Sequence, residues 1–500
     1  MVKPIMIQGT MSNAGKSVVT AGLCRIFMQD GFLCAPFKSQ NMALNSYITS
    51  DGLEMGRAQV MQAEAAGIEP SVLMNPVLLK PTGDMGSQVI VNGEVLGTMD
   101  AAAYFEFRPQ LRSLIMAAYS ELASLYDIIV IEGAGSPAEI NLNKDDIVNM
   151  GMAEMAGAPV IIVADIDRGG VFASVYGTIA LLKENERSRV RGIIINKFRG
   201  DLKILKPGLK MLEELTNVPV LGVIPYLSLD IDDEDSLSDR FKAKKTGENP
   251  LDIAVIHLPH VSNFTDFNAL SRMPPVGLRY VDSAEDLKTP DLIIIPGTKN
   301  TMNDLLWLRK IGLEAAIKKR SSAGIPVIGI CGGYQMLGSV LDDPEGIELE
   351  KGGNLRGMEL LPVSTVYENE KVRTRVSGKT LLFDDEFAGL SLTEIEGYEI
   401  HMGRTVLLEG AKPFSLLSNG NYDGAVCGNV FGSYLHGLFD GGLGTALIKM
   451  LIRKKGIESV WEDLISTDRH KDLQYNILAD AMRSSLDMPQ IYKILGEGIA

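Results

Sequence analysis

The sequence predicts an α/β protein with a doubly wound parallel sheet, a second α/β domain and a helical tail. Short apolar runs of strand length alternate with helical stretches in both halves of the chain, and this alternation is typical of parallel sheets. A charged segment interrupts the alternation near the middle. At 500 residues, the chain also exceeds what one hydrophobic core usually holds.

In the first half, residues 4–8 are predicted to form a strand and residues 17–29 a helix. Val19, Leu23, Ile26 and Phe27 fall on one face of that helix. Further apolar runs predict strands at residues 127–132, 158–164, 190–196 and 218–224.

The second half begins with predicted strands at residues 251–256, 291–296 and 325–330, followed by a helix from Tyr334. Strands near residues 362–367, 395–401 and 425–431 are expected to complete a mixed sheet. The charged segment, rich in Asp and Lys and ending in Gly-Glu-Asn-Pro, is interpreted as a linker. The predicted divisions are a first domain 1–227, a linker 228–250, a second domain 251–443 and a helical extension 444–500.

Composition excludes several classes of protein. A net charge of −15 and the lack of dense Lys/Arg runs argue against nucleic-acid binding. No uninterrupted apolar stretch is long enough to cross a bilayer. The 4 cysteines are too few for a disulfide framework and predict a reducing, cytoplasmic location. The sequence allows a homo-oligomer without indicating one.

A phosphate-binding loop follows the first predicted strand, in Gly9-Thr-Met-Ser-Asn-Ala-Gly-Lys-Ser17. Backbone N–H groups and a helix N-terminus would hold the phosphates of ATP, and Lys16 would supply a charge to the β/γ oxygens. Thr10 stands where the usual pattern has glycine. The residues predicted to bind ATP in this loop are Thr10, Asn13, Ala14, Gly15, Lys16 and Ser17.

Two further residues end predicted strands of this half. Glu132 is a candidate for holding Mg²⁺ together with the Ser17 hydroxyl, although alone it would be an ordinary strand-end carboxylate. Asn196 ends a strand at the carboxyl edge of the sheet, where doubly wound folds bind ligands, and is a candidate for contacting the purine.

The second half carries a nucleophile elbow, Gly329-Ile-Cys-Gly-Gly333, between a predicted strand and helix. Cys331 would be the nucleophile, and the helix N-terminus favours its thiolate. The N–H of Gly332 can stabilise an oxyanion. Of the 5 histidines, His436 follows an apolar strand and is the predicted base. A cysteine–histidine pair can cleave the amide of glutamine through a glutamyl-thioester.

The phosphate loop resembles that of dethiobiotin synthetase-like proteins, which carry threonine at the position of Thr10. Longer motifs resemble the cobyric acid synthase family over most of the chain, among them residues 38–46, 51–59, 75–81, 165–170 and 262–267. The order of Cys331 and His436 resembles class I glutamine amidotransferases. This resemblance implies an ATP-, Mg²⁺- and glutamine-dependent ligase that amidates a corrinoid, adenosylcobyrinic acid a,c-diamide, at carboxylates b, d, e and g.

The resemblance also suggests a second oxyanion N–H near Gly297, in Pro296-Gly-Thr-Lys-Asn-Thr301. Class I enzymes usually have H-x-E, but Leu438 holds the place of that glutamate. The third member of the triad is therefore open, with Glu399 as one candidate. His401 is expected to be structural or to line a pocket.

Three alternatives remain open from the sequence. Cobyrinate a,c-diamide synthase shares the two-domain plan, although residues 38–46 and 51–59 fit cobyric acid synthase better. A ligase similar to CTP synthase would be expected to keep H-x-E. The chain could also be an ATPase or binding protein whose amidase domain is inert. The order of the amidations, the ammonia path, the corrin contacts and the timing of cobalt insertion are not predicted.

Overall fold

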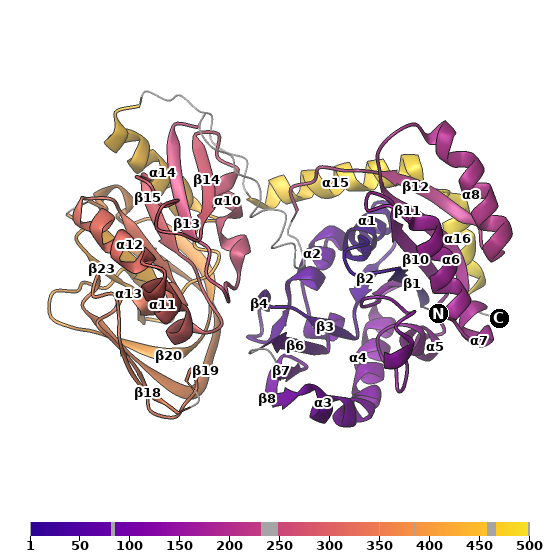
Figure 1. Ribbon diagram of the computed structural model, residues 1–500, viewed down its shortest axis with the longest axis horizontal. Helices are drawn as coiled ribbons and strands as arrows, with labels where there is room; N and C mark the ends of the chain where they lie inside the picture. Colours follow the sequence, from indigo (N-terminus) through magenta and orange to yellow (C-terminus); the bar gives the residue numbers. More distant parts are fainter. Residues whose placement is uncertain are drawn as a thin grey trace. The chain divides into compact units, whose positions relative to one another are not determined.

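The computed structural model describes residues 2–81, 86–231, 249–349, 351–384, 386–457 and 467–498 (Figure 1). The chain forms two compact units that are not contiguous in sequence. The first unit contains residues 1–43, 53–234 and 468–500, and the second contains residues 44–52 and 235–467. Most of the predicted linker, residues 232–248, lies outside the described residues.

A parallel sheet forms the centre of the first unit, with the strand order β12-β11-β10-β1-β9-β2 among the described residues. Every neighbouring pair is parallel. The strands β9 and β10 are buried along their whole length, as expected for parallel strands covered on both faces. The doubly wound sheet is therefore confirmed. Its strands are β1 (Lys3–Gly9), β2 (Cys34–Phe37), β9 (Ile128–Glu132), β10 (Val160–Asp165), β11 (Val190–Phe198) and β12 (Val220–Pro225).

Helices connect these strands. They are α1 (Lys16–Gln29), α2 (Arg57–Ala66), α3 (Ala101–Phe107), α4 (Leu111–Leu125), α5 (Met150–Ala156), α6 (Val171–Leu181), α7 (Glu184–Arg187) and α8 (Leu202–Thr216). A smaller sheet, which the sequence did not predict, contains β3 (Gln40–Met42), β6 (Val77–Pro81), β7 (Gly86–Val91) and β8 (Glu94–Asp100).

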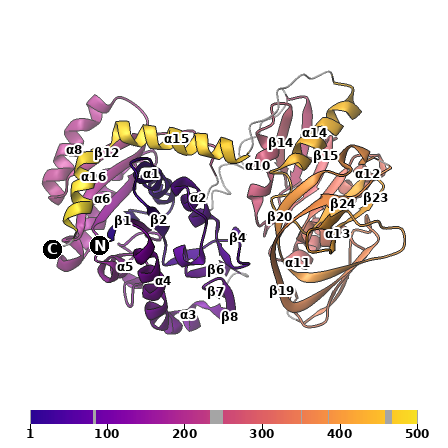
Figure 2. The same ribbon diagram turned by 180° about the vertical axis from the view of Figure 1, so that it is seen from behind.

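The predicted tail is helical, but its helices belong to both units. The first, α14 (Gly442–Lys455), lies in the second unit. The helices α15 (Thr467–Ser485) and α16 (Met488–Glu497) pack beside α1 and the large sheet of the first unit (Figure 2). Met482 and Ile491 are fully buried there, in one cluster with Ile5 and Leu23. The end of the chain thus completes the core of the first unit.

The second unit contains a mixed sheet with the order β14-β13-β15-β16-β24-β23 among the described residues. Only the edge strand β23 is antiparallel to its neighbour in this order. The strands are β13 (Leu251–Ile256), β14 (Val276–Val281), β15 (Leu292–Ile295), β16 (Val327–Ile330), β23 (Ala425–Cys427) and β24 (Val430–Ser433). The helices are α10 (Asn268–Ser271), α11 (Thr301–Lys310), α12 (Leu313–Ser322), α13 (Gly332–Leu337) and α14.

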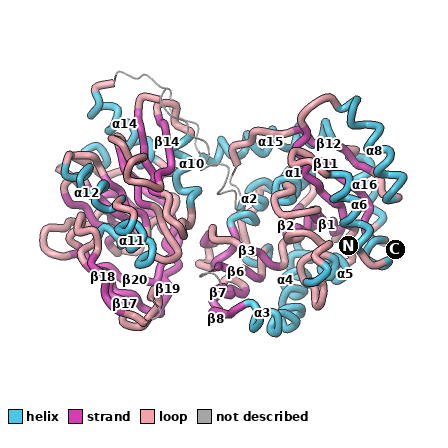
Figure 3. The backbone as a smooth tube through the Cα atoms, viewed as in Figure 1, coloured by secondary structure: helices cyan, strands magenta, loops and turns pink. Residues whose placement is uncertain are grey.

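One prediction about this sheet is wrong. The strands expected near residues 362–367 and 395–401 do not join it, because they belong to a long antiparallel pair in a separate sheet (Figure 3). Burial largely alternates at the start of β19, which is typical of an antiparallel sheet with one solvated face. That sheet contains β17 (Val340–Asp343), β18 (Gly353–Arg356), β19 (Val363–Thr380), β20 (Glu394–Leu407), β21 (Ser415–Leu417) and β22 (Tyr422–Asp423).

Within the described residues, no helix has both the length and the apolar character that a bilayer span requires.

Candidate active sites

The phosphate loop lies at the carboxyl end of β1 and leads into α1, where the sequence placed it. Gly15 has a φ of 97°, and a Cβ there would lie 2.1 Å from Nδ2 of Asn196. Only glycine fits this turn without strain. The amide of Asn196 donates to the Ala14 carbonyl at 3.0 Å. Asn196 therefore supports the loop, and its contact with a purine stays a prediction.

The other predicted loop residues gather at the same edge of the sheet. Lys16 is buried, and its ammonium donates to the carbonyls of Met11 and Gly135 at 3.2 and 3.1 Å. The carbonyl of Asn13, a residue with a φ of 61°, accepts from the Lys197 ammonium at 2.7 Å. The backbone N–H of Thr10 donates to β10, and Ala14 is fully buried.

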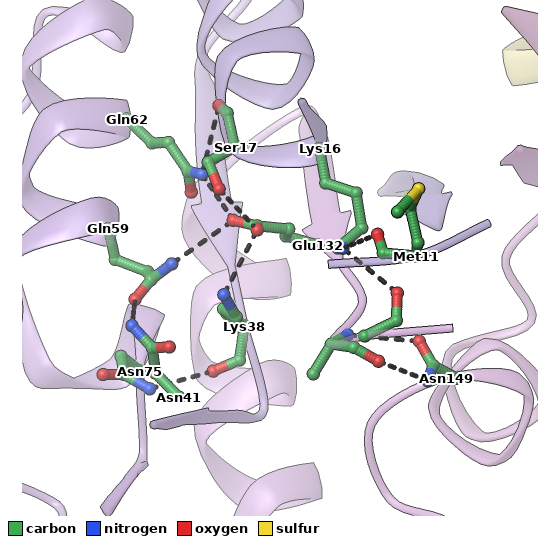
Figure 4. A network of polar contacts seen from close by, with 12 residues as sticks. Met11, Lys16, Ser17, Lys38, Asn41, Gln59, Gln62, Asn75, Glu132 and Asn149 are labelled. Carbon is green, nitrogen blue, oxygen red and sulfur yellow. Dashed lines mark hydrogen bonds and ion pairs between the residues drawn. The ribbon is translucent and has the colours of Figure 1, made fainter. Parts of the chain in front are cut away.

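Glu132 is the centre of a buried polar network beside this loop (Figure 4). Its Oε1 accepts from the Ser17 hydroxyl at 2.8 Å and from the Lys38 ammonium at 3.2 Å. Its Oε2 accepts from the Gln62 amide at 2.6 Å. The sequence alone indicated no role for Lys38 or Gln62. Both lie in or close to the motifs 38–46 and 51–59, which were the available signal.

The oxygens of Ser17 and Glu132 fit a magnesium ion, because Mg²⁺ prefers hard oxygen ligands and fills its shell with waters and substrate phosphates. Across the described ranges, no cluster of three or more Asp, Glu, His or Cys side chains could hold a metal by itself. A magnesium ion at this position would take its remaining ligands from water or from the phosphates of a bound nucleotide.

A second site lies in the other unit, at the carboxyl ends of four parallel strands that neighbour one another. The order β13-β15-β16-β24 brings together the segments that follow these strands, and this edge of an α/β sheet is where ligands bind. Cys331 follows β16, with φ 51° and ψ −109° at the start of α13. This strained backbone is the geometry of a nucleophile elbow. The thiol points to the Ile400 carbonyl, with Sγ and O 3.6 Å apart.

His436 follows β24, the strand next to the Cys331 strand. It is 1% exposed, and its Nδ1 lies 2.7 Å from Oδ2 of the buried Asp266. Burial alone would lower the pKa of His436. The charge and hydrogen bond of Asp266, together with the Cys331 thiol, outweigh burial and raise this pKa to about 10. A histidine held between a carboxylate and a thiol can carry a proton for thiol chemistry.

Asp266 is a site residue that was not predicted from the sequence. It lies within the quoted motif 262–267, but nothing in that motif indicates which histidine it contacts. Glu399 does not contact His436 in the described contacts. Its carboxylate lies 3.9 Å from Nε2 of His401, whose Nδ1 faces the Gly403 carbonyl at 2.8 Å. Leu438 is buried and apolar.

The predicted oxyanion residues, Gly332 and Gly297, both lie close to the nucleophile elbow or the base. Gly332 is the first residue of α13, so its N–H has no acceptor within that helix. A Cβ on Gly332 would lie 3.2 Å from the Thr298 nitrogen, and one on Gly297 would lie 2.9 Å from Cε1 of His436. The Gly297 loop therefore passes close to both the elbow and the base, and the donor of a second N–H stays a prediction.

A cavity of about 610 Å³ lies beside β20. Glu399, His401 and Tyr434 are among its lining residues, and the rings of His401 and Tyr434 stack with centroids 3.6 Å apart. His401 thus lines a cavity, as expected. Of the other cysteines, Cys24 and Cys34 are buried in the core of the first unit, and Cys427 ends β23.

Comparison with known proteins identifies a family domain in each half of the chain. Residues 5–236 match the family described as the CobQ/CobB/MinD/ParA nucleotide binding domain. Residues 252–443 match the CobB/CobQ-like glutamine amidotransferase domain. The fold and these matches define a glutamine amidotransferase joined to a nucleotide-binding domain, which confirms the predicted fold class.

Relatives that match over their full length identify the family within this class of enzymes. The chain is 58% identical to the cobyric acid synthase of Ruminiclostridium cellulolyticum, over 100% of this chain and 98% of that protein. It is 55% identical to that of Lachnoclostridium phytofermentans, over 100% of both chains. It is also 55% identical to that of Yersinia enterocolitica, over 98% of both. The chain belongs to the cobyric acid synthase family, as its motifs predicted.

Proposed function

We propose that this protein amidates adenosylcobyrinic acid a,c-diamide at carboxylates b, d, e and g, using ATP and glutamine, to give adenosylcobyric acid in cobalamin biosynthesis. The observation that carries the proposal is the presence of two sites in one chain of this family. One is the phosphate loop with its buried carboxylate, and the other is the cysteine–histidine site. The four free cysteines fit a cytoplasmic enzyme.

In the first unit, the residues of the phosphate loop and Glu132 fit a bound ATP and its Mg²⁺ ion, which we propose as the ligands of this site. A bound nucleotide would supply the phosphoryl group that makes a carboxylate reactive toward ammonia. The loop amides and the Lys16 ammonium would hold the phosphates and neutralise their charge, which is the main catalytic contribution in phosphoryl transfer. Ser17 and Glu132 would position the metal. The carbonyls that Lys16 contacts in this structure would then exchange for phosphate oxygens.

In the second unit, we propose that His436 takes the proton of Cys331, and the thiolate attacks the side-chain amide of glutamine. The N–H groups of Gly332 and of the Gly297 loop would stabilise the oxyanion. His436 then gives its proton to the departing ammonia, leaving a glutamyl-thioester. Water hydrolyses that thioester to glutamate and restores the thiol. Because Asp266 raises the pKa of His436, the imidazolium that forms beside the thiolate is stabilised.

Mass spectrometry of the corrinoid product tests the reaction. With ATP, Mg²⁺ and glutamine, each amidation replaces OH by NH₂ and lowers the mass by about 1 Da, so the proposed enzyme gives a loss of about 4 Da. Cys331→Ser should remove glutamine-dependent synthesis and keep synthesis from ammonium salts at high pH. An unchanged substrate mass with the parent enzyme would refute the proposed reaction. Retained glutamine-dependent synthesis in Cys331→Ser would place the nucleophile elsewhere.

A further inference from the structure

We infer that Asp266 is the residue that positions His436 in the amidase site. This inference rests on the proposed glutamine hydrolysis and adds to it a carboxylate from a distant part of the sequence. Asp266 follows β13, two strands away from β16, whose carboxyl end carries the nucleophile. It acts on the reaction through His436 and does not need to touch the substrate.

The two oxygens of Asp266 hold two consecutive residues. Oδ2 lies 2.7 Å from Nδ1 of His436, and Oδ1 accepts the Gly437 N–H at 3.0 Å. The side chains of Asp266 and His436 are 4% and 1% exposed, so water does not compete for this contact. A carboxylate that faces Nδ1 requires a proton there and leaves Nε2 available for the thiol proton. Asp266 therefore sets the tautomer and the ring orientation together.

The backbone around Asp266 makes further contacts. Asn263 begins the short 3₁₀ helix Phe264–Phe267 in a left-handed conformation with φ 51°. The Asp266 N–H donates to the Asn263 carbonyl at 3.0 Å. The ring of Phe267 packs against that of Phe439, three residues beyond His436, with centroids 6.3 Å apart. The segments that carry the carboxylate and the imidazole are thus fixed to each other by more than the hydrogen bond.

Other groups around His436 do not offer the same contact. The Tyr398 ring stacks over the imidazole with centroids 5.4 Å apart, and its backbone exchanges hydrogen bonds with that of His436. Cys331 is the proton donor of the proposed reaction. Glu399 faces His401. Within the described contacts, Asp266 is the carboxylate in hydrogen-bond range of His436.

Asp266→Asn tests the inference, because it keeps the size of the side chain and removes its charge. Asparagine can turn its NH₂ toward Nδ1, which favours the tautomer that cannot accept the thiol proton. We expect glutamine hydrolysis to lose about 10²–10⁴ in kcat with little change in KM, as expected when an orienting carboxylate is neutralised. The alkaline limit of activity, meaning the pH above which glutamine hydrolysis declines, should move to lower pH, because the imidazolium of His436 loses the negative charge of Asp266. Synthesis from ammonium salts should stay at the parent level.

Two further variants separate positioning from folding. Asp343→Asn changes another fully buried aspartate of the same unit, which accepts the N–H groups of Ile347, Glu348 and Leu349 and is placed in neither site. It should lower the unfolding temperature without moving the pH profile of glutamine hydrolysis. Asp266→Glu restores the charge with a longer side chain, and should recover part of the lost kcat and the parent's alkaline limit even if Asp266→Asn folds poorly.

The outcomes are distinct. Glutamine hydrolysis by Asp266→Asn within threefold of the parent, with a superimposable pH profile, would overturn the inference. So would an equal loss of kcat in Asp266→Asn and Asp266→Glu with both alkaline limits unmoved, because packing alone would then explain the effect. A parent enzyme that hydrolyses no glutamine would instead refute the proposed function. A loss confined to glutamine-dependent turnover, with a shifted pH profile, supports Asp266 as the positioning residue.

Discussion

Replacing Glu132 by glutamine tests the nucleotide site most directly. The change keeps the side chain's shape and removes the negative charge that Ser17, Lys38 and Gln62 all face. The remaining oxygen could still accept from Ser17 and Lys38. The new NH₂ group would face the Gln62 amide, and Gln62 could turn its own oxygen toward it, since that oxygen accepts no hydrogen bond within the described part of the chain.

The expected cost follows from this geometry. Ser17 and Gln62 can keep hydrogen bonds, so the main loss is the charge pairing of Lys38, whose side chain is 5% exposed beside a fully buried Glu132. Breaking a buried ion pair costs about 3–5 kcal/mol, and we expect the lower end because the glutamine oxygen stays within reach. For the metal, losing a charged partner should weaken Mg²⁺ binding by about 1.5–3 kcal/mol. The Mg²⁺ concentration that gives half of the maximal activity should therefore rise about 10- to 100-fold.

The assay is a magnesium titration of ammonium-dependent amidation, alongside calorimetric binding of ATP and chemical unfolding of the protein. Glu54→Gln is the matched control, because Glu54 forms another buried ion pair in the same unit, with Lys80 at 2.7 Å. Both variants should lose stability, but only Glu132→Gln should need more Mg²⁺. If the magnesium titrations of Glu132→Gln and the parent superimpose, Glu132 is a structural carboxylate and the proposed metal position is wrong.

Three further predictions concern the two sites. Lys16→Ala should abolish amidation with either glutamine or ammonium and spare glutamine hydrolysis; full ammonium-dependent synthesis would exclude an ATP role for the loop. Gly297→Ala would place a Cβ 2.9 Å from Cε1 of His436. The kcat of glutamine hydrolysis should therefore fall at least about tenfold, which corresponds to a rise of about 1.4 kcal/mol in the activation free energy. An unchanged kcat would contradict the close approach of this loop to the base. The pKa of His436 is raised from 6.5 to about 10. Its contribution to the stability of the folded protein is therefore complete below pH 6.5 and is lost as pH rises through about 10. Between these pH values, unfolding in urea should show a smaller loss of stability for His436→Gln than for the parent, and equal losses would exclude this linkage.

Features encoded in neighbouring residues were predictable from the sequence. The phosphate loop and the elbow each join a buried strand to a helix within a few residues, so local periodicity and glycine placement were enough. The tail was predicted as helical for the same reason. Local patterns could not show that α15 and α16 complete the core of the first unit, since that packing brings Met482 against residues near the start of the chain.

The antiparallel pair of β19 and β20 shows where local patterns mislead. Each strand was predicted from a short apolar stretch, at residues 362–367 and 395–401, and both were assigned to the main sheet. The strands extend much further, through Val363–Thr380 and Glu394–Leu407. Their continuations are charged and largely exposed or half-buried, and cross-strand pairing holds them in the sheet. Pairing between distant segments is not visible in the periodicity of either one.

The amidase site depends on strand order, which is why its nucleophile was easier to predict than its positioning residue. Cys331 was identified by its own turn, and His436 by elimination among few histidines. Asp266 lies 170 positions from His436 and has no fixed spacing from either partner. It reaches the imidazole because β13, β15, β16 and β24 are parallel neighbours, so the segments after all four strands meet at one edge. Since β17 to β23 intervene between β16 and β24 along the chain, that adjacency is a property of the folded sheet. The sequence therefore did not indicate which carboxylate would stand in for the glutamate of H-x-E, and the folded sheet brings Asp266 within hydrogen-bond range of His436.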